Sequence, residues 1–270
     1  MKGGKKILGK QIRLNRLINK KSGKMLGVMV DHPIGHGVLP GLVDINKRLE
    51  QIVEGRPDVI TMHKGIAKKC FYRFADSGIP FLLKCTSFSP YQKTFDVLVS
   101  DVEEAIQLGA DGVSIGVILG GPRQPEMLHN LGIISKQAES YGMPLVAHIY
   151  SRGEYIEKET TVENTSYAVR VAAELGVDIA KTHYTGSKET FKQVINATPG
   201  KVVIAGGKVG NELKDLFQMT KDAMDIGTFG VAYGRGIWQS PDPTRMIQAL
   251  KLIIHEGAGV EEALEYFNSK

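Results

Sequence analysis

The sequence is poor in cysteine and tryptophan, and the shortage of cysteine excludes whole classes of protein. Cys70 and Cys85 are the two cysteines in 270 residues, and no metal-ligand spacing accompanies either of them. A small secreted domain held by disulfides, or a structural zinc module, needs several cysteines. Both classes are therefore excluded, and a reducing cytoplasm is the expected location.

Long apolar runs are also missing. No run approaches the length of about 20 residues that a membrane-spanning helix requires. The basic residues 1–6 are not followed by an apolar core with a small-residue cleavage site, so we interpret them as a frayed start and not as a signal peptide. We therefore expect no membrane partner.

The excess of positive charge is small and scattered. Lysine and arginine total 34 against 29 acidic residues, for a formal net charge of +5. No basic run carries the interleaved aromatic residues that are typical of nucleic-acid-binding surfaces. We therefore expect no nucleic-acid partner, and a phosphorylated small-molecule substrate explains the positive balance better.

What the sequence does contain is one pattern repeated eight times. Each repeat begins with a short apolar run, continues through a glycine or polar turn and ends in a helix-like pattern. Near-continuous apolar runs indicate strands buried on both faces, as in a parallel sheet. Eight such units predict an α/β fold, a (β/α)8 or TIM barrel, with residues 1–270 as a single domain. The predicted strands are residues 25–30, 59–62, 81–83, 112–118, 145–149, 177–180, 202–205 and 230–233.

Glycines mark the ends of several predicted helices, because glycine adopts the left-handed conformation that commonly follows a helix. One additional amphipathic helix is predicted before the first strand, and another is predicted after the last strand. The predicted helices are residues 10–20, 101–108, 164–175, 213–226 and 260–267.

The segment that follows the third strand is unusual. Residues 85–99 are too many for a simple connection to the next helix, and they include Phe88, Tyr91 and Phe95. An extra hairpin and a lid over the barrel mouth both fit this segment.

Glycines and basic residues follow the seventh and eighth predicted strands. Gly206 and Gly207 end the seventh strand, and Gly234 and Arg235 end the eighth. The loops after these two strands form the usual phosphate site of TIM barrels. Glycine lets backbone N–H groups approach phosphate oxygens, and Arg235 adds a charge-assisted contact. Lys208 is a further expected phosphate contact.

Lys181 ends the sixth predicted strand, beside the strands expected to hold phosphate. Burial lowers the pKa of a lysine and leaves its amine free to attack a carbonyl carbon. A lysine that reaches from the strand end into water is the alternative. Lys64, Lys84 and Lys208 are rival nucleophiles, and Lys64 also suits phosphate binding or acid–base chemistry.

Three further side chains at strand ends suit proton transfer or substrate contact. Asp31 follows the first strand, where a carboxylate is costly unless paired, so it supports the lysine or caps a neighbouring element. Tyr150 ends the fifth strand and can exchange a proton with a substrate hydroxyl, unless it only packs under a loop. His148 shares a face with Tyr150 because strand side chains alternate. It either contacts the substrate or orients another side chain.

His32 and His36 raise the possibility of a metal pair. Neither has a cysteine or glutamate companion at a useful spacing, so we expect no metal and no cofactor. His32 is then a candidate substrate contact.

From about residue 9 to the C-terminus, the sequence motifs at the ends of the predicted strands resemble those of the archaeal-type class I aldolases. That family includes fructose-1,6-bisphosphate aldolases, the 2-amino-3,7-dideoxy-D-threo-hept-6-ulosonate synthases of an alternative aromatic route, and the autoinducer-2 phosphate thiolase. The matching segments include Val30-Asp31-His32, His63-Lys64-Gly65, Tyr150-Ser151-Arg152-Gly153, Lys181-Thr182-His183-Tyr184-Thr185-Gly186, Ile204-Ala205-Gly206-Gly207 and Gly234-Arg235.

The resemblance implies that Lys181 forms a Schiff base with a phosphorylated ketose, that Tyr150 transfers the proton and that Asp31 supports both. It also implies a phosphate site at Gly206, Gly207, Gly234 and Arg235, and a ring-like homo-oligomer.

The chain departs from the family at several positions. His148 stands where the bisphosphate aldolases carry tryptophan, and Ser151 and Pro33 replace a proline and a glycine. Tyr150 argues against the thiolase branch, which lacks it. The substrate therefore stays open between fructose 1,6-bisphosphate and a related deoxy-keto-sugar phosphate. A phosphosugar isomerase or epimerase with Asp31 as the base, and a non-catalytic phosphosugar-binding regulator, are the rival hypotheses.

Overall fold

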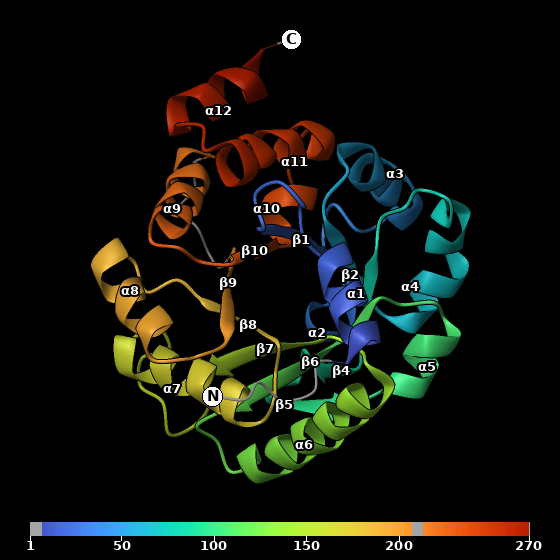
Figure 1. Cartoon of the computed structure of the whole chain (residues 1–270), viewed down its shortest axis with the longest axis vertical. Coiled ribbons are helices and arrows are strands. Elements are labelled where there is room, and N and C mark those ends of the chain that lie inside the picture. The colour runs from blue at the N-terminus through green and yellow to red at the C-terminus, as the bar shows by residue number, and fades with distance from the viewer. Residues whose placement is uncertain (1–6, 207–212, 270) are drawn as a thin grey trace.

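Eight parallel strands close into a barrel in the computed structural model, which describes residues 7–206 and 213–269. The helices surround the strands in a ring (Figure 1). Around the barrel the strands follow the order β1-β10-β9-β8-β7-β6-β3-β2. The predicted TIM barrel is confirmed. The barrel strands are β1 (Met25–Met29), β2 (Val59–Met62), β3 (Phe81–Lys84), β6 (Gly112–Leu119), β7 (Leu145–Ser151), β8 (Ile179–His183), β9 (Lys201–Ala205) and β10 (Gly230–Tyr233).

Helices connect the strands on the outside of the barrel. Asp101 caps α5 by accepting a hydrogen bond from a backbone N–H, and Gly109, Gly176 and Gly227 have the positive φ angles predicted for residues after helices. The helices are α1 (Leu8–Arg16), α2 (Pro33–His36), α3 (Ile45–Gly55), α4 (Lys64–Lys69), the 3-10 helix η1 (Phe71–Phe74), α5 (Val102–Gln107), α6 (Gln124–Tyr141), α7 (Val162–Glu174), α8 (Lys188–Asn196), α9 (Leu213–Asp225), α10 (Arg235–Trp238), α11 (Pro243–Lys251), the π-helix η2 (Leu252–Glu256) and α12 (Val260–Asn268).

Several predicted boundaries differ from the observed ones by a few residues, and two of these differences have a clear local reason. Helix α1 ends at Arg16 because the Asn19 side chain accepts hydrogen bonds from two following backbone N–H groups and makes a turn. Strand β8 starts at Ile179 because Asp178 accepts a hydrogen bond from the backbone N–H of Leu145.

The barrel interior changes from apolar to polar along the strands. Near the strand starts, side chains such as Val146 and Ile179 pack with Leu17 after α1. Two residues further on, the inward side chains are His148 and Lys181, because strand side chains alternate between faces. The apolar layer therefore closes one end of the barrel, and the polar layer lines the other end.

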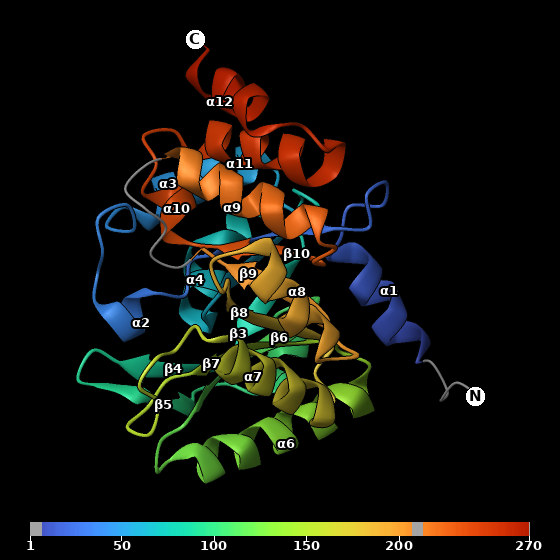
Figure 2. The ribbon, with the colours of Figure 1, turned by 90° about the vertical axis from the view of Figure 1, so that its left-hand side faces the viewer.

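The segment after β3 forms an antiparallel hairpin of β4 (Thr86–Ser89) and β5 (Gln92–Leu98). Figure 2 shows this hairpin and α2 at the end of the barrel opposite α1. The hydroxyl of Thr86 accepts a hydrogen bond of 2.6 Å from the backbone N–H of Gly116, which fixes the hairpin against β6. The predicted hairpin is confirmed, and it forms part of the barrel mouth.

Helix length and composition also bear on membrane insertion. Within residues 7–206 and 213–269, no helix is both long enough and apolar enough to cross a bilayer.

Candidate active site

A cavity of about 140 Å³ opens at the carboxyl ends of the barrel strands. It brings together side chains that are far apart in the sequence, because parallel strands all deliver their ends to one rim. Residues 207 and 208, both predicted phosphate contacts, lie outside the described residues. The predicted site residues that line the cavity are Asp31, His32, His148, Tyr150, Lys181, Gly206, Gly234 and Arg235.

Lys181 points into the barrel, as its position two residues after the inward-facing Ile179 requires. Only 7% of the residue is exposed. Burial lowers the pKa of its amine to about 8, although the nearby Asp31 carboxylate opposes this shift. About a fifth of the amine is therefore neutral at pH 7.4, far more than for an exposed lysine, and this neutral form can act as a nucleophile.

Asp31 lies between two histidines. Its Oδ1 is 3.5 Å from Nδ1 of His32, and its Oδ2 is 3.8 Å from Nδ1 of His148. Burial alone would raise the pKa of Asp31, but the two histidines and the lysines at positions 84 and 181 bring it well below its usual range. Asp31 is therefore an ionised carboxylate close to the reactive amine.

The two histidines beside Asp31 are neutral. Burial lowers the pKa of His32 to about 4 and places the pKa of His148 well below its ordinary value. The His32 ring packs edge-on against Trp238 with ring centroids 5.3 Å apart. A Cβ on Gly234 would overlap Cε1 of His32 and lie 2.8 Å from its Nε2. Gly234 therefore makes room for His32 as well as exposing backbone to the cavity.

Tyr150 lies one strand away from Lys181. Its ring is 4.5 Å from that of His183, and the guanidinium carbon of Arg152 is 5.8 Å from the Tyr150 ring. Burial raises the pKa of the Tyr150 hydroxyl, against the opposing effect of Arg152. The phenol is therefore protonated and can donate a proton within the cavity.

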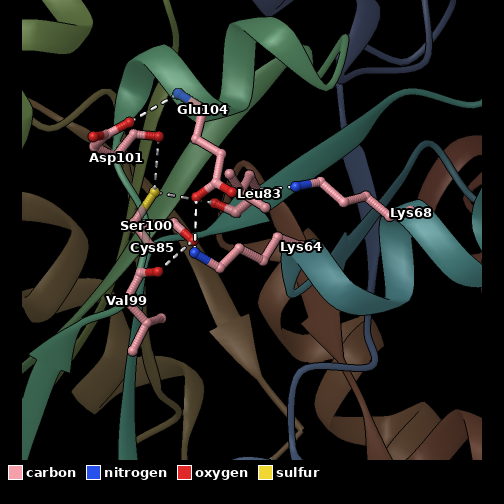
Figure 3. Close-up of polar contacts among 8 residues, drawn as sticks. All are labelled: Lys64, Lys68, Leu83, Cys85, Val99, Ser100, Asp101 and Glu104. Carbon is pink, nitrogen blue, oxygen red and sulfur yellow. Dashed lines mark hydrogen bonds and ion pairs between the residues drawn. The ribbon is translucent and has the colours of Figure 1, made fainter.

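The structure does not bring Lys64 to this cavity. Lys64 begins α4, where the chain turns away from the barrel, and its Nζ lies 3.0 Å from Oε2 of Glu104 on α5 (Figure 3). Lys68 contacts the same carboxylate at 3.5 Å. The predicted role of Lys64 in substrate binding therefore has no geometric support. Its ammonium group is paired with the Glu104 carboxylate and does not line the cavity.

Several residues that line the cavity were not predicted as site residues, and Lys84 and Asp96 are the two buried charged ones among them. The sequence suggests Lys84 only as a rival nucleophile, but it is 5% exposed and lines the cavity together with Asp31. Asp96 on β5 is also 5% exposed and lines the cavity. No local pattern distinguishes Asp96, because its burial depends on contact between the hairpin and β6.

His32 and His36 are the two histidines whose spacing raised the possibility of a metal site. In the described part of the chain, no three His, Cys, Asp or Glu side chains converge in a group that could hold a metal ion.

Comparison with known proteins identifies relatives over almost the whole chain. The chain is 35% identical over 257 residues to the 2-amino-3,7-dideoxy-D-threo-hept-6-ulosonate synthase of Halobacterium salinarum, with 95% of each chain covered. It is 34% identical over 263 residues to 2-amino-3,7-dideoxy-D-threo-hept-6-ulosonate synthase 1 of Archaeoglobus fulgidus, with 96% of each chain covered.

A solved structure is similar in fold. It is an archaeal fructose-1,6-bisphosphate aldolase with its catalytic lysine covalently bound to the carbinolamine intermediate of the substrate. It superposes with a TM-score of 0.83 at 27% identity, covering 91% of this chain and 99% of that chain. In addition, the model of the DeoC/LacD family aldolases matches residues 25–240. The resemblance noted from the sequence is confirmed: the chain is an enzyme that belongs to the DeoC/LacD family of aldolases.

Proposed function

We propose that this aldolase forms a Schiff base through Lys181 with a phosphorylated ketose, and makes or breaks a carbon–carbon bond next to the imine. One observation carries the proposal: a buried lysine whose pKa is about 8 shares a cavity with an ionised carboxylate and a protonated phenol. The covalent intermediate divides one difficult step into easier ones.

The residues around Lys181 have separate roles in this mechanism. The neutral amine attacks the carbonyl carbon, and the carbinolamine loses water as Asp31 supports proton transfer. The iminium then withdraws the electron pair of the breaking carbon–carbon bond. In the condensation direction, protonated Tyr150 donates to the alkoxide that forms from the aldehyde, and cleavage reverses this step.

The phosphate site lies beside Lys181. Gly206 and Gly234 line the cavity at the ends of β9 and β10, and Arg235 lies beside them. Together with the sequence-predicted Gly207 and Lys208, they would hold the phosphate and fix the ketone next to the amine. His32 and His148 are both neutral, and we expect them to contact the substrate where they line the cavity.

The substrate is a phosphorylated keto-sugar. The relatives named as hept-6-ulosonate synthases and as fructose-1,6-bisphosphate aldolases support this class. Two assays, cleavage of fructose 1,6-bisphosphate and condensation with aspartate semialdehyde, decide between a bisphosphate aldolase activity and a hept-6-ulosonate synthase activity. The presence of Tyr150 in the cavity argues against the thiolase branch, and the chemistry of the relatives argues against an isomerase or a non-catalytic regulator.

We further propose that the protein works in the cytoplasm as one domain per chain in a ring-like homo-oligomer. Light scattering coupled to gel filtration measures the number of chains, and a monomer at working concentration contradicts the ring.

Borohydride reduction in the presence of fructose 1,6-bisphosphate or dihydroxyacetone phosphate, followed by peptide mapping, tests the Schiff base. We expect a single modified lysine at position 181. Modification at Lys84 alone, or cleavage of substrate without any trapped lysine, would contradict the proposal.

A further inference from the structure

The cavity has a wall that the mechanism above does not use. It is formed by Lys84 at the end of β3 and Asp96 on β5, whose carboxyl group lies against the backbone of Gly116 on β6. In the ring of eight strands, β3 stands four places from β9, and β6 stands four places from β10. This wall therefore faces the phosphate site across the barrel.

Gly116 makes room for the carboxyl group of Asp96. Gly116 is paired in register with His148, and His148 with Lys181, so the three residues follow one another across the neighbouring strands β6, β7 and β8. A Cβ on Gly116 would overlap both Oδ2 and the carboxyl carbon of Asp96. The carboxyl group thus occupies the space that a side chain at position 116 would fill, two strands away from the strand of the reactive lysine.

Lys84 and Asp96 retain unused hydrogen-bonding capacity. Oδ1 of Asp96 is buried without a hydrogen-bond partner. Among the residues described, Nζ of Lys84 makes no direct hydrogen bond or ion pair, although the Asp96 and Asp31 carboxyl groups act on it electrostatically. Buried polar groups without partners are costly and uncommon. Each of these two groups would therefore be stabilised by a hydrogen bond to a ligand atom.

The chemistry of the pair selects the kind of ligand group. An ammonium group would be repelled by Lys84, and a carboxylate would be repelled by Asp96 and Asp31. A hydroxyl group both accepts and donates, so it can accept from Lys84 and donate to Asp96 at once. The wall therefore suits a neutral hydroxyl.

We propose that Lys84 and Asp96 are specificity-determining residues that bind the hydroxyl on the ketose carbon next to the imine carbon, on the side away from the phosphate. This inference rests on the proposed function, which places the phosphate at the ends of β9 and β10 and the imine carbon at Lys181. The next carbon along the substrate then points toward β3 and β6.

The test compares two ketones that differ only in this hydroxyl, dihydroxyacetone phosphate and hydroxyacetone phosphate. The rate of borohydride trapping at Lys181 is measured for each in the wild type, D96N, D96A and K84M. We expect the wild type to prefer dihydroxyacetone phosphate by about ten- to a hundredfold, the range for hydrogen bonds to charged groups. The three variants should reduce this preference to about threefold or less, mainly by slowing the hydroxylated ketone.

A second route moves the carboxyl group without changing its chemistry. The substitution G116A displaces Asp96 and should lower the preference as D96A does. In the D96A background the alanine at 116 meets no carboxyl group, so G116A should add little further effect. K93A, at an exposed position of the same hairpin strand, is the matched control and should retain the wild-type preference.

The outcomes separate the two proposals. If Lys181 is labelled and the preference survives in D96N, D96A and G116A, the hydroxyl contact is wrong and the Schiff base stands. A wild type that reacts equally with both ketones overturns the contact as well. If neither ketone labels Lys181 in the wild type, the proposed function fails and this inference fails with it. Labelling of Lys181 also reports that a variant is folded.

Discussion

Oδ2 of Asp31 lies 3.8 Å from Nδ1 of His148, which pairs in register with Lys181 on the neighbouring strand. The carboxylate thus adjoins a neutral imidazole and acts electrostatically on the reactive amine. It raises the pKa of Lys181 against the stronger effect of burial. This balance keeps the amine available both as a nucleophile and as a cation.

Replacement of Lys181 by methionine should reduce turnover by about a thousandfold or more, because no other amine can form the imine. K64M is the matched control, since Lys64 pairs with Glu104 outside the cavity. It should keep activity within about twofold, as expected for an exposed ion pair. Steady-state rates with fructose 1,6-bisphosphate measure both. Comparable losses in the two variants would contradict the assignment.

Imine formation should depend on pH with an inflection near the Lys181 pKa of about 8. Below that pH the protonated, unreactive form accumulates, so the rate falls about tenfold per unit; above it the rate reaches a plateau. The rate of borohydride trapping from pH 6 to 10 measures the profile. D31N removes the charge that raises this pKa and should move the inflection to lower pH. An inflection near 10 in the wild type would mean that the lysine is not desolvated.

Burial of Lys181 should also appear in stability. Its folded pKa is below the ordinary value of 10.5, so between about pH 8 and 10.5 the unfolded state binds more protons. This group therefore makes the protein more stable as pH rises through that window, and K181M should lose this part of the dependence. Urea unfolding at several pH values measures it, and identical slopes in both proteins would contradict the prediction.

The substitution Y150F should separate imine formation from bond cleavage. The phenol hydroxyl donates the proton to the alkoxide, so its removal should slow cleavage and condensation by about a hundred- to ten thousandfold. Trapping of the imine at Lys181 should persist. Y155F, at a side chain that is 72% exposed, is the control and should resemble the wild type. Loss of trapping together with turnover in Y150F would indicate a structural role.

Arg235 should matter only for phosphorylated substrates. We expect R235M to lower kcat/KM for dihydroxyacetone phosphate by about ten- to a hundredfold, because a charge-assisted contact is lost. The slow reaction of unphosphorylated dihydroxyacetone should change little. R170M is the control, since Arg170 is exposed and pairs with Glu174 along α7. An equal loss for both ketones would place the phosphate elsewhere.

Gly234 should resist substitution for steric reasons. An added methyl group at 234 overlaps the His32 ring, so G234A should lower the free energy of unfolding by about 1–3 kcal/mol. Gly132 within α6 has open space around its Cβ position. G132A should instead stabilise the protein by up to about 1 kcal/mol, the helix preference for alanine. Urea unfolding measures both, and similar changes in the two variants would contradict the steric argument.

The amino-acid sequence by itself determined most of the barrel. Apolar runs and helix-ending glycines predicted all eight barrel strands within a few residues, because burial on both faces and the left-handed turn are local requirements. It also placed Lys181 at the carboxyl end of a barrel strand, the end at which the active sites of such barrels lie. Local periodicity carries this information without any tertiary contact.

Only the tertiary structure decided how the cavity walls are completed. Asp96 enters the cavity because the hairpin docks on β6, where Gly116 lacks a side chain, and these two residues are not neighbours in the sequence. The Lys64 side chain lies outside the cavity because α4 begins at this residue and its ammonium group contacts Glu104 on α5. Both outcomes depend on packing between elements that are far apart along the chain, and no local pattern encodes such packing.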